Sequence, residues 1–344
     1  MTNPLEIAIV GAGMAGIVCA RELQAAGQQG IAIFEKSRGV GGRLTTRRMF
    51  DTCVDRGTCY ISPKGAEFQS LFDRLIAANI VEIWTDTTHT LTAAGEILAD
   101  PDLYPRYVTP NGMNQIAKYL ATDLDLRCGQ RAISIVPDGN LWRLKLEGTE
   151  SAEILTRQVI LAIPAPQAVD LLAPLADILP GEFLAALKAV DFYPSIAIAA
   201  GYTPIQLAEW ETAYPQVKAV TCTDDPILAW LGVDSSKRHQ PAPPAFVLQS
   251  TAKFAAKYPH PEDTAAASLA MLERASDRFL PWFRESQWQQ PHLWRYAFPK
   301  SPRVDDFLSI DLPAPLFCTG DWCRGRKVED AYLAGLAVAN AIRG

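Results

Sequence analysis

Apolar and polar positions in the first 36 residues predict a strand, a tight turn, a helix and a second strand. Residues 7–10 are a continuous apolar run, which is typical of a parallel strand buried on both faces. Residues 17–26 carry apolar side chains at helical spacing, and Gly27 is placed to end that helix. Residues 31–35 form a second apolar strand that ends at a glutamate. The pattern therefore predicts a βαβ unit.

The same kind of pattern returns at the other end of the chain, where residues 316–319 predict a buried strand and residues 330–342 a helix of small residues. The middle is more irregular, and it mixes strand and helix patterns. We therefore predict an α/β protein in which a mixed β-sheet plus helices is inserted into a Rossmann-type nucleotide-binding domain. The expected bounds are 1–75, 110–165 and 300–344 for the nucleotide-binding domain, and 76–109 and 166–299 for the inserted substrate domain.

Composition is that of a globular protein and limits the choice of partners. The chain has 344 residues, which favours two domains, and 49% of them are apolar. A net charge of −6 gives no support for binding nucleic acid or an anionic membrane. The apolar stretches are too short to span a bilayer, and no signal peptide is recognisable. The seven cysteines fit no metal template, so we expect no metal site and a reduced, cytoplasmic compartment.

The turn after the first strand has the GxGxxG spacing of a dinucleotide-binding loop. Gly11 permits the tight turn, Gly13 lets backbone N–H groups approach a pyrophosphate, and Gly16 lets the helix pack close to the strand. Glu35 follows Gly16 by 19 residues, at the end of the second strand, where a carboxylate accepts hydrogen bonds from ribose hydroxyls. The neighbouring cofactor contacts that we predict are Met14, Ala15 and Lys36.

Two further segments indicate FAD rather than NAD as the dinucleotide. Gly39-Val40-Gly41-Gly42-Arg43 and Cys318-Thr319-Gly320-Asp321-Trp322 resemble the GGR and GD motifs of the FAD-dependent amine oxidase-like flavoproteins. The resemblance implies their two-domain fold, with Arg43 on the cofactor and Asp321 on its ribitol chain. It also implies that the helix from Val328 points its N-terminus at the flavin, where its dipole stabilises negative charge. The remaining contacts expected for non-covalently bound FAD are Gly42, Ala132 and Ala331.

Several patches resemble the renalase-like branch of these flavoproteins. They are residues 42–47, 54–61, 111–113, 162–167, 294–297 and 320–333. The resemblance implies oxidation of a reduced nicotinamide dinucleotide isomer, with hydride passing to flavin N5 and electrons to O2. Tyr60, Trp294 and Tyr296 are the substrate-side candidates, and alternation places Trp294 and Tyr296 on one face of a strand. Two basic clusters, Arg47-Arg48 and Arg324-Gly325-Arg326-Lys327, are candidates for attracting a phosphate-bearing substrate.

One segment departs from the branch. Where relatives often read DLGAQY, this chain has Asp55-Arg56-Gly57-Thr58-Cys59-Tyr60, on the expected substrate side of the flavin. Three alternatives therefore stay open: an amine oxidase of the monoamine or polyamine type, a desaturase or isomerase on the same scaffold, and a flavin-free binding protein.

Overall fold

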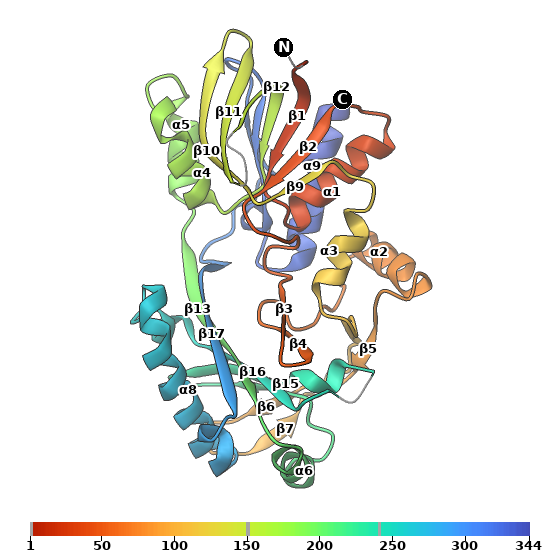
Figure 1. The fold of residues 1–344 in the computed structure, drawn as a ribbon, viewed down its shortest axis with the longest axis vertical. Helices are drawn as coiled ribbons and strands as arrows, with labels where there is room; N and C mark the ends of the chain where they lie inside the picture. Colours follow the sequence, from red (N-terminus) through yellow and green to blue (C-terminus); the bar gives the residue numbers. More distant parts are fainter. Residues whose placement is uncertain (1–2, 149–151, 240–241) are drawn as a thin grey trace.

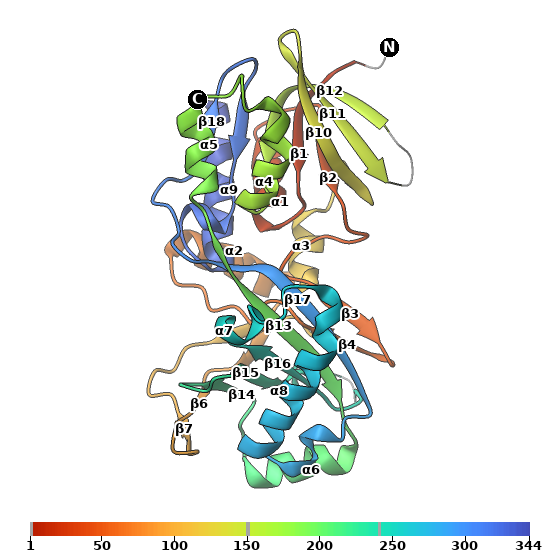
Figure 2. The same cartoon turned by 90° about the vertical axis from the view of Figure 1, so that its left-hand side faces the viewer.

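The computed structural model describes residues 3–148, 152–239 and 242–344. These residues form two β-sheets, one above the other in Figure 1, each with its own helices. The two sheets are linked by the long strands β13 (Phe192–Gly201) and β17 (Trp288–Pro299), which pair antiparallel and run from the first sheet into the second (Figure 2).

The first sheet is built around the βαβ unit predicted from the sequence. Strands β1 (Leu5–Val10), β2 (Ile31–Glu35), β9 (Leu126–Cys128), β12 (Ala152–Leu161) and β19 (Leu316–Cys318) run parallel, in the order β19-β12-β1-β2-β9. The sheet continues antiparallel through β10 (Gln130–Asp138), β11 (Leu141–Gly148) and β18 (Leu308–Ile310). Residues 7–9 are almost inaccessible to solvent, because helices and the antiparallel strands cover both faces of β1.

Helices α1 (Met14–Ala25) and α9 (Val328–Arg343) pack against each other on one face of this sheet. Gly335 makes their close approach possible, since a Cβ at that position would lie 2.4 Å from the carbonyl oxygen of Ala15. Helices α2 (Ala66–Ala77) and α3 (Asn114–Leu120) join the same hydrophobic core. Because α1 is covered by both the sheet and α9, it is buried on almost every side of its first two turns.

The second sheet has the order β17-β13-β16-β15-β14-β6-β7. Its remaining strands are β16 (Ala245–Ser250), β15 (Leu228–Val233), β14 (Ala219–Cys222), β6 (His89–Leu91) and β7 (Ile97–Ala99). Helices α6 (Pro204–Ala213), α7 (Ala252–Ala255) and α8 (Thr264–Arg278) contribute to its core. Two small ribbons, β3–β4 (Thr46–Met49 and Thr52–Asp55) and β5–β8 (Glu82–Thr85 and Arg106–Val108), lie between the two sheets (Figure 1).

The segment 166–190 lies with the first sheet, whereas the sequence predicted it to be part of the substrate domain. Helices α4 (Ala165–Leu172) and α5 (Gly181–Lys188) bury Leu171, Leu172 and Leu187 in the core beneath β10–β12. The apolar face of each helix needs a surface to pack against, and the antiparallel strands β10–β12 provide it. Helical periodicity in the sequence shows that such a face exists but not which sheet it packs on. The other domain bounds stay predictions.

Candidate active site

The carboxyl ends of the parallel strands meet at one edge of the first sheet. Val10 of β1 is in register with Phe34 of β2 and Leu161 of β12, and Leu161 is in register with Cys318 of β19. The segments that follow these strands must therefore lie together. They are the GxGxxG loop, Glu35, residues 162–167 and Asp321, and this is the edge where open α/β sheets bind ligands.

One side of the GxGxxG loop is packed tightly against the protein, and the other side is open at Gly13. Gly11 has a φ of +105°, and a Cβ there would lie 2.6 Å from the carbonyl oxygen of Ala162. Gly16 is equally constrained, since its Cβ would meet the carbonyl oxygen of Gly11. At Gly13 a Cβ would meet no atom within 4 Å. The loop is therefore packed against the sheet on one side and free on the other, where a pyrophosphate can approach the N-terminus of α1.

Glu35 is 8% exposed and organises the loop before any ligand binds. Its Oε2 accepts a hydrogen bond from the backbone N–H of Ala12 (2.9 Å), and its Oε1 accepts one from Ser37 (2.8 Å). Each carboxylate oxygen retains a lone pair for a ribose hydroxyl. Next to it, Lys36 is exposed and donates to the side-chain oxygen of Gln167, while Met14 and Ala15 are buried at the start of α1.

Arg43 and Asp321 form a bidentate pair across the site. The Nη1 atom of Arg43 lies 2.7 Å from Oδ2 of Asp321, and its Nη2 lies 2.6 Å from Oδ1. Arg43 also donates to the carbonyl oxygen of Ala297 in β17 (2.9 Å). The neighbouring Gly42 is exposed, and a Cβ there would lie 3.5 Å from Cα of Gly13. The GGR loop thus faces the GxGxxG loop. It also meets Asp321 through Arg43, although 278 residues separate these two residues in the sequence.

The last helix completes the cofactor edge. Val328 begins α9, and Ala331 packs one turn further along against the core. Glu329, which sequence reasoning missed, accepts hydrogen bonds from the backbone N–H groups of Lys64 (3.0 Å) and Gly65 (2.6 Å) at the N-terminus of α2. An acidic residue in the first turn of a helix was the available sequence signal. Ala132 lies in β10, where the register with β11 shifts, and it packs against the second core cluster of the Rossmann sheet.

These residues fit FAD. The open faces of Gly13 and Gly42 leave backbone exposed for a pyrophosphate, and the helix dipole favours its charge. Glu35 has acceptor capacity for the adenosine ribose, and Asp321 has acceptor capacity for ribitol hydroxyls. The order of these residues along the sheet edge follows the register of strands β2, β1, β12 and β19.

The three substrate-side candidates occupy different environments. Trp294 donates from its indole N–H to the carbonyl oxygen of Arg56 (2.9 Å), beside Gly57. Tyr296 instead meets Phe192 edge-on, at 5.6 Å between ring centroids, in the core under the Rossmann sheet. The expected common face is not supported, because the register of β13 with β17 shifts between Trp294 and Phe298 and strict alternation ends there. Tyr60 is partly buried near Trp84, and burial raises the pKa of its hydroxyl.

Comparison with known proteins identifies the family. The family model described as flavin containing amine oxidoreductase matches residues 81–343. The chain belongs to the flavin-containing amine oxidoreductase family. A model described as an NAD(P)-binding Rossmann-like domain matches residues 9–75. Mouse renalase is 24% identical over 355 residues, which cover 98% of each chain.

Solved structures of amine oxidases share the fold. A putrescine oxidase bound to putrescine superposes with a TM-score of 0.71 at 14% identity, over 100% of both chains. Cyclohexylamine oxidase from Brevibacterium oxydans superposes with a TM-score of 0.69 at 13% identity, over 99% of this chain and 100% of the other. Together with the family match, these likenesses confirm the two-domain α/β fold, the renalase-like resemblance and an FAD-dependent oxidoreductase.

A buried network of four charges ties the β3–β4 ribbon of this flavoprotein to the segment that follows β15 of the second sheet, and sequence reasoning did not find it. Asp55 at the end of β4 lies 3.0 Å from Arg238 and 3.4 Å from Lys237, and Asp234 pairs with both cations. The side chains of Asp55, Asp234 and Lys237 are 0% exposed. Burial opposes the charge on Asp55, but Lys237 and Arg238 outweigh it and hold the pKa of this carboxyl below its ordinary value. The network fixes the segment that leads to Arg56 and Gly57.

The basic clusters are only partly available to a ligand. Arg324 pairs with Asp306, and Arg326 donates to the carbonyl oxygen of Lys300. Lys327 is exposed and directly precedes α9, with its backbone N–H donating to Asp330. Arg47 and Arg48 are exposed on the β3–β4 ribbon. The expected attraction of an anion therefore shifts toward the ribbon, since the charge of Arg324 is offset locally.

All seven cysteines are free thiols, and those near the cofactor edge are buried. Burial raises the pKa of the Cys323 thiol to about 12, and burial also raises the pKa of the Cys318 thiol well above its ordinary value. Thiols held protonated in this way are weak nucleophiles. Non-covalent attachment of FAD stays a prediction.

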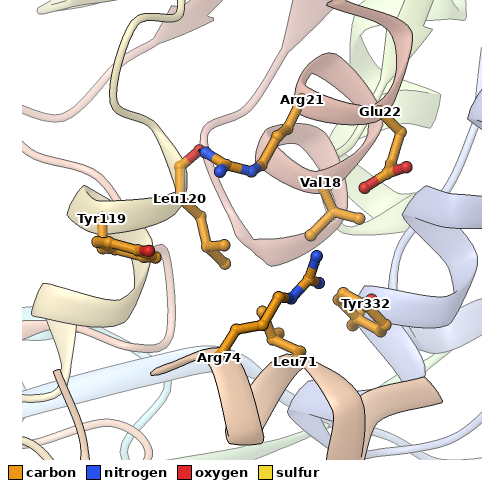
Figure 3. A pocket seen from close by; sticks show the side chains of 8 residues that line it. All are labelled: Val18, Arg21, Glu22, Leu71, Arg74, Tyr119, Leu120 and Tyr332. Carbon is orange, nitrogen blue, oxygen red and sulfur yellow. The ribbon is translucent and has the colours of Figure 1, made fainter. Parts of the chain in front are cut away.

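A small cavity of about 40 Å³ lies away from this edge, between α1, α2, α3 and α9 (Figure 3). Its volume holds a few water molecules at most. Arg21 donates to the carbonyl oxygen of Leu120 beside it, and Arg74 extends toward Tyr332 in the close-up view. No residue of the Arg43–Asp321 pair lines the cavity, so we do not assign it to the substrate. In the described part of the chain, no helix combines the length and hydrophobicity needed to cross a membrane.

Proposed function

We propose that the protein oxidises a reduced nicotinamide dinucleotide, in particular a non-standard isomer, with O2 as the electron acceptor. When bound, FAD supplies the hydride acceptor at N5 and the route by which the electrons reach O2 as H2O2. The chain's own residues hold the cofactor and position the substrate beside it.

One observation carries the proposal. The patches that resemble the renalase-like branch are far apart in sequence, yet they meet at one place. Arg43 contacts Asp321 and the carbonyl oxygen of Ala297, and Trp294 contacts Arg56. This convergence, together with the likeness to mouse renalase along 98% of both chains, supports a shared substrate class.

The residues beside the cofactor edge suit a planar, anionic substrate. The indole of Trp294 lies beside Gly57. A Cβ atom at residue 57 would lie 3.4 Å from the indole ring and 2.0 Å from the carbonyl oxygen of Arg43. A ring so placed can wall a flat heterocycle. Arg47 and Arg56 add positive charge on the same side, which attracts a phosphate-bearing molecule.

The second candidate is an amine oxidase. The putrescine and cyclohexylamine oxidases that share this fold act on amines according to their names, which favours that activity here. An amine is a cation at neutral pH, and the positive charge of Arg47 and Arg56 opposes its approach.

Anaerobic stopped-flow reduction separates the two candidates. The holoenzyme is mixed with preparations of reduced nicotinamide dinucleotides that contain dihydro-isomers and, separately, with putrescine, cyclohexylamine and a primary aromatic amine. We expect the dinucleotides to bleach the flavin faster than any amine, at a rate that falls with added salt because screening shortens the reach of the field. Rapid bleaching by an amine with none by the dinucleotides replaces the proposal with the amine oxidase.

A further inference from the structure

Arg56 is a partly buried cation without a counter-charge. Its Nε atom is buried and has no hydrogen-bond partner among the residues that the structure describes. Burial lowers the pKa of its guanidinium, and the charge of Arg47 lowers that pKa further. No carboxylate acts in the opposite direction within the described residues.

Among the described residues, the other buried or half-buried arginines have partners for their guanidinium groups. Arg43 pairs with Asp321, Arg238 with Asp55 and Asp234, and Arg274 with Asp225. Arg106, which is buried and has no ion pair with a described residue, donates to two backbone carbonyl oxygens and to the Thr88 hydroxyl. Leaving a desolvated cation unpaired is costly, and proteins keep such an arrangement mainly where a ligand completes it. Arg56 is therefore the exception that needs an explanation.

Its neighbours are hydrogen-bond donors and positive charge. Arg47 is in register with Val54 on the ribbon, and Arg56 follows the last residue of β4, near enough for the charge of Arg47 to lower the pKa of Arg56. Across from them on β17, His292 meets the Trp294 ring at 4.3 Å between centroids. Burial lowers the pKa of His292 to about 4, and the charge of Arg56 contributes to that shift. An anion placed here would meet two guanidinium groups and an imidazole.

The backbone of Arg56 lies close to the residues that we predict to bind the cofactor. Gly57 follows Arg56 directly and packs on the backbone of Arg43, which is paired with Asp321. The carbonyl oxygen of Arg56 accepts the indole N–H of Trp294. The backbone of Arg56 thus lies beside Trp294 and next to the glycine that packs on Arg43.

We propose that Arg56, assisted by Arg47, binds a phosphate group of the substrate and selects anionic over cationic substrates. The proposal rests on the proposed function for the identity of the phosphate-bearing molecule. A guanidinium presents a planar fork that matches phosphate oxygens with two parallel hydrogen bonds.

The test measures anion binding without turnover. Inorganic pyrophosphate is titrated into the FAD-loaded protein by calorimetry, for wild type, Arg56→Leu and Arg56→Lys. Arg295→Leu is the matched control, because it removes the same charge from an exposed position on neighbouring β17. We expect Arg56→Leu to weaken pyrophosphate binding about tenfold or more, Arg56→Lys to weaken it less, and Arg295→Leu to change it less than twofold. Flavin content and thermal unfolding verify that each variant is folded.

The outcomes separate this inference from the proposed function. Equal pyrophosphate binding in wild type and Arg56→Leu overturns the inference, whichever substrate reduces the flavin. Tighter binding of acetate than of pyrophosphate also overturns it, and assigns the site to a carboxylate. If pyrophosphate binding depends on Arg56 but no reduced nicotinamide bleaches the flavin, the phosphate site stands and the proposed substrate fails.

Discussion

Single carboxylates carry much of the cofactor site. Glu35 ends the parallel strand β2, Asp321 lies three residues after the end of the parallel strand β19, and both side chains are buried. Glu35 holds the backbone of the dinucleotide loop, and Asp321 holds Arg43. The structural role of these side chains and the ligand-binding role that we propose for them are therefore combined in the same residues.

Replacing either carboxylate should weaken FAD binding. We expect Glu35→Ala and Asp321→Ala each to cost about 1.5–3 kcal/mol of FAD affinity, roughly 10–100-fold, because each loses charged hydrogen bonds to cofactor hydroxyls. Titration of the apoprotein with FAD measures the effect. Asp102→Ala, at an exposed carboxylate, is the control and should titrate like wild type. Unchanged curves for both site variants contradict the binding mode.

His292 should make the free energy of unfolding depend on pH between about 4 and 6.5. Burial holds the pKa of His292 at about 4 in the folded protein, against 6.5 ordinarily, so between these values the unfolded chain binds more protons. The free energy of unfolding should therefore fall as pH drops from 6.5 toward 4. We expect a contribution of about 1–2 kcal/mol, less than the full shift because the ring is partly exposed.

Denaturant unfolding at pH 7 and pH 5 measures this contribution. His292→Gln should lose less stability over that interval than wild type. His260→Gln, at an exposed histidine, should keep the wild-type dependence. An identical pH dependence in His292→Gln and wild type rules out the assignment.

At the scale of elements, the β3–β4 ribbon depends on charges that it does not itself contain. Asp55 at its end is held by Lys237 and Arg238 from the 3-10 helix η2 (Asp234–Lys237) and the residue after it. It also accepts hydrogen bonds from the Thr46 hydroxyl (2.7 Å) and the Met113 backbone (2.8 Å). The ribbon is thereby fixed between the two sheets.

Removing one charge of this network should destabilise the protein strongly. We expect Asp55→Asn to lower the free energy of unfolding by about 3–5 kcal/mol, because Lys237 and Arg238 are left with too little negative charge in a buried site. Thermal and denaturant unfolding of the holoenzyme measure the change. Asp51→Asn, at the exposed tip of the same ribbon, should unfold like wild type. A loss below about 1 kcal/mol would show that the network is not stabilising.

For the whole molecule, cofactor binding is a property of several segments that come together. Asp321 meets Arg43 from the opposite end of the chain, and α9 packs on α1 through Gly335. Neither the N-terminal βαβ unit nor the C-terminal segment contains the complete site.

The cofactor should leave when the whole fold is lost. The thiols beside the GD motif, Cys318 and Cys323, are buried and protonated, which makes a covalent flavin link unfavourable. We expect acid precipitation to release the yellow colour into the supernatant. Colour that stays with the pellet contradicts non-covalent binding.

Local patterns predicted the parts of the site that depend on backbone geometry. Gly11 needs its left-handed conformation within a strand–turn–helix unit, and Glu35 follows at a spacing that the unit fixes. The register of the parallel strands then places their ends together. For this reason motifs could indicate that the dinucleotide loop, Glu35, Arg43 and Asp321 lie near one another, while their contacts with FAD stay predictions.

Contacts between segments far apart in the sequence decided the features that motifs could not predict. Asp55 and Lys237 are 182 residues apart, and no periodicity connects a buried aspartate to its partner. The irregular register in β17 separates the contacts of Trp294 from those of Tyr296, and helices α4 and α5 joined the first sheet because its meander offered an apolar surface.

The sequence by itself determined the Rossmann-type unit, the cofactor class and the family resemblance, because these depend on short motifs whose chemistry is local. Only the tertiary structure decided which charges are compensated. Arg324 forms an ion pair with Asp306, whereas Arg56 has no carboxylate partner among the described residues. Charge pairing depends on distances of a few ångströms between segments far apart in the chain, and those distances exist only in the folded protein.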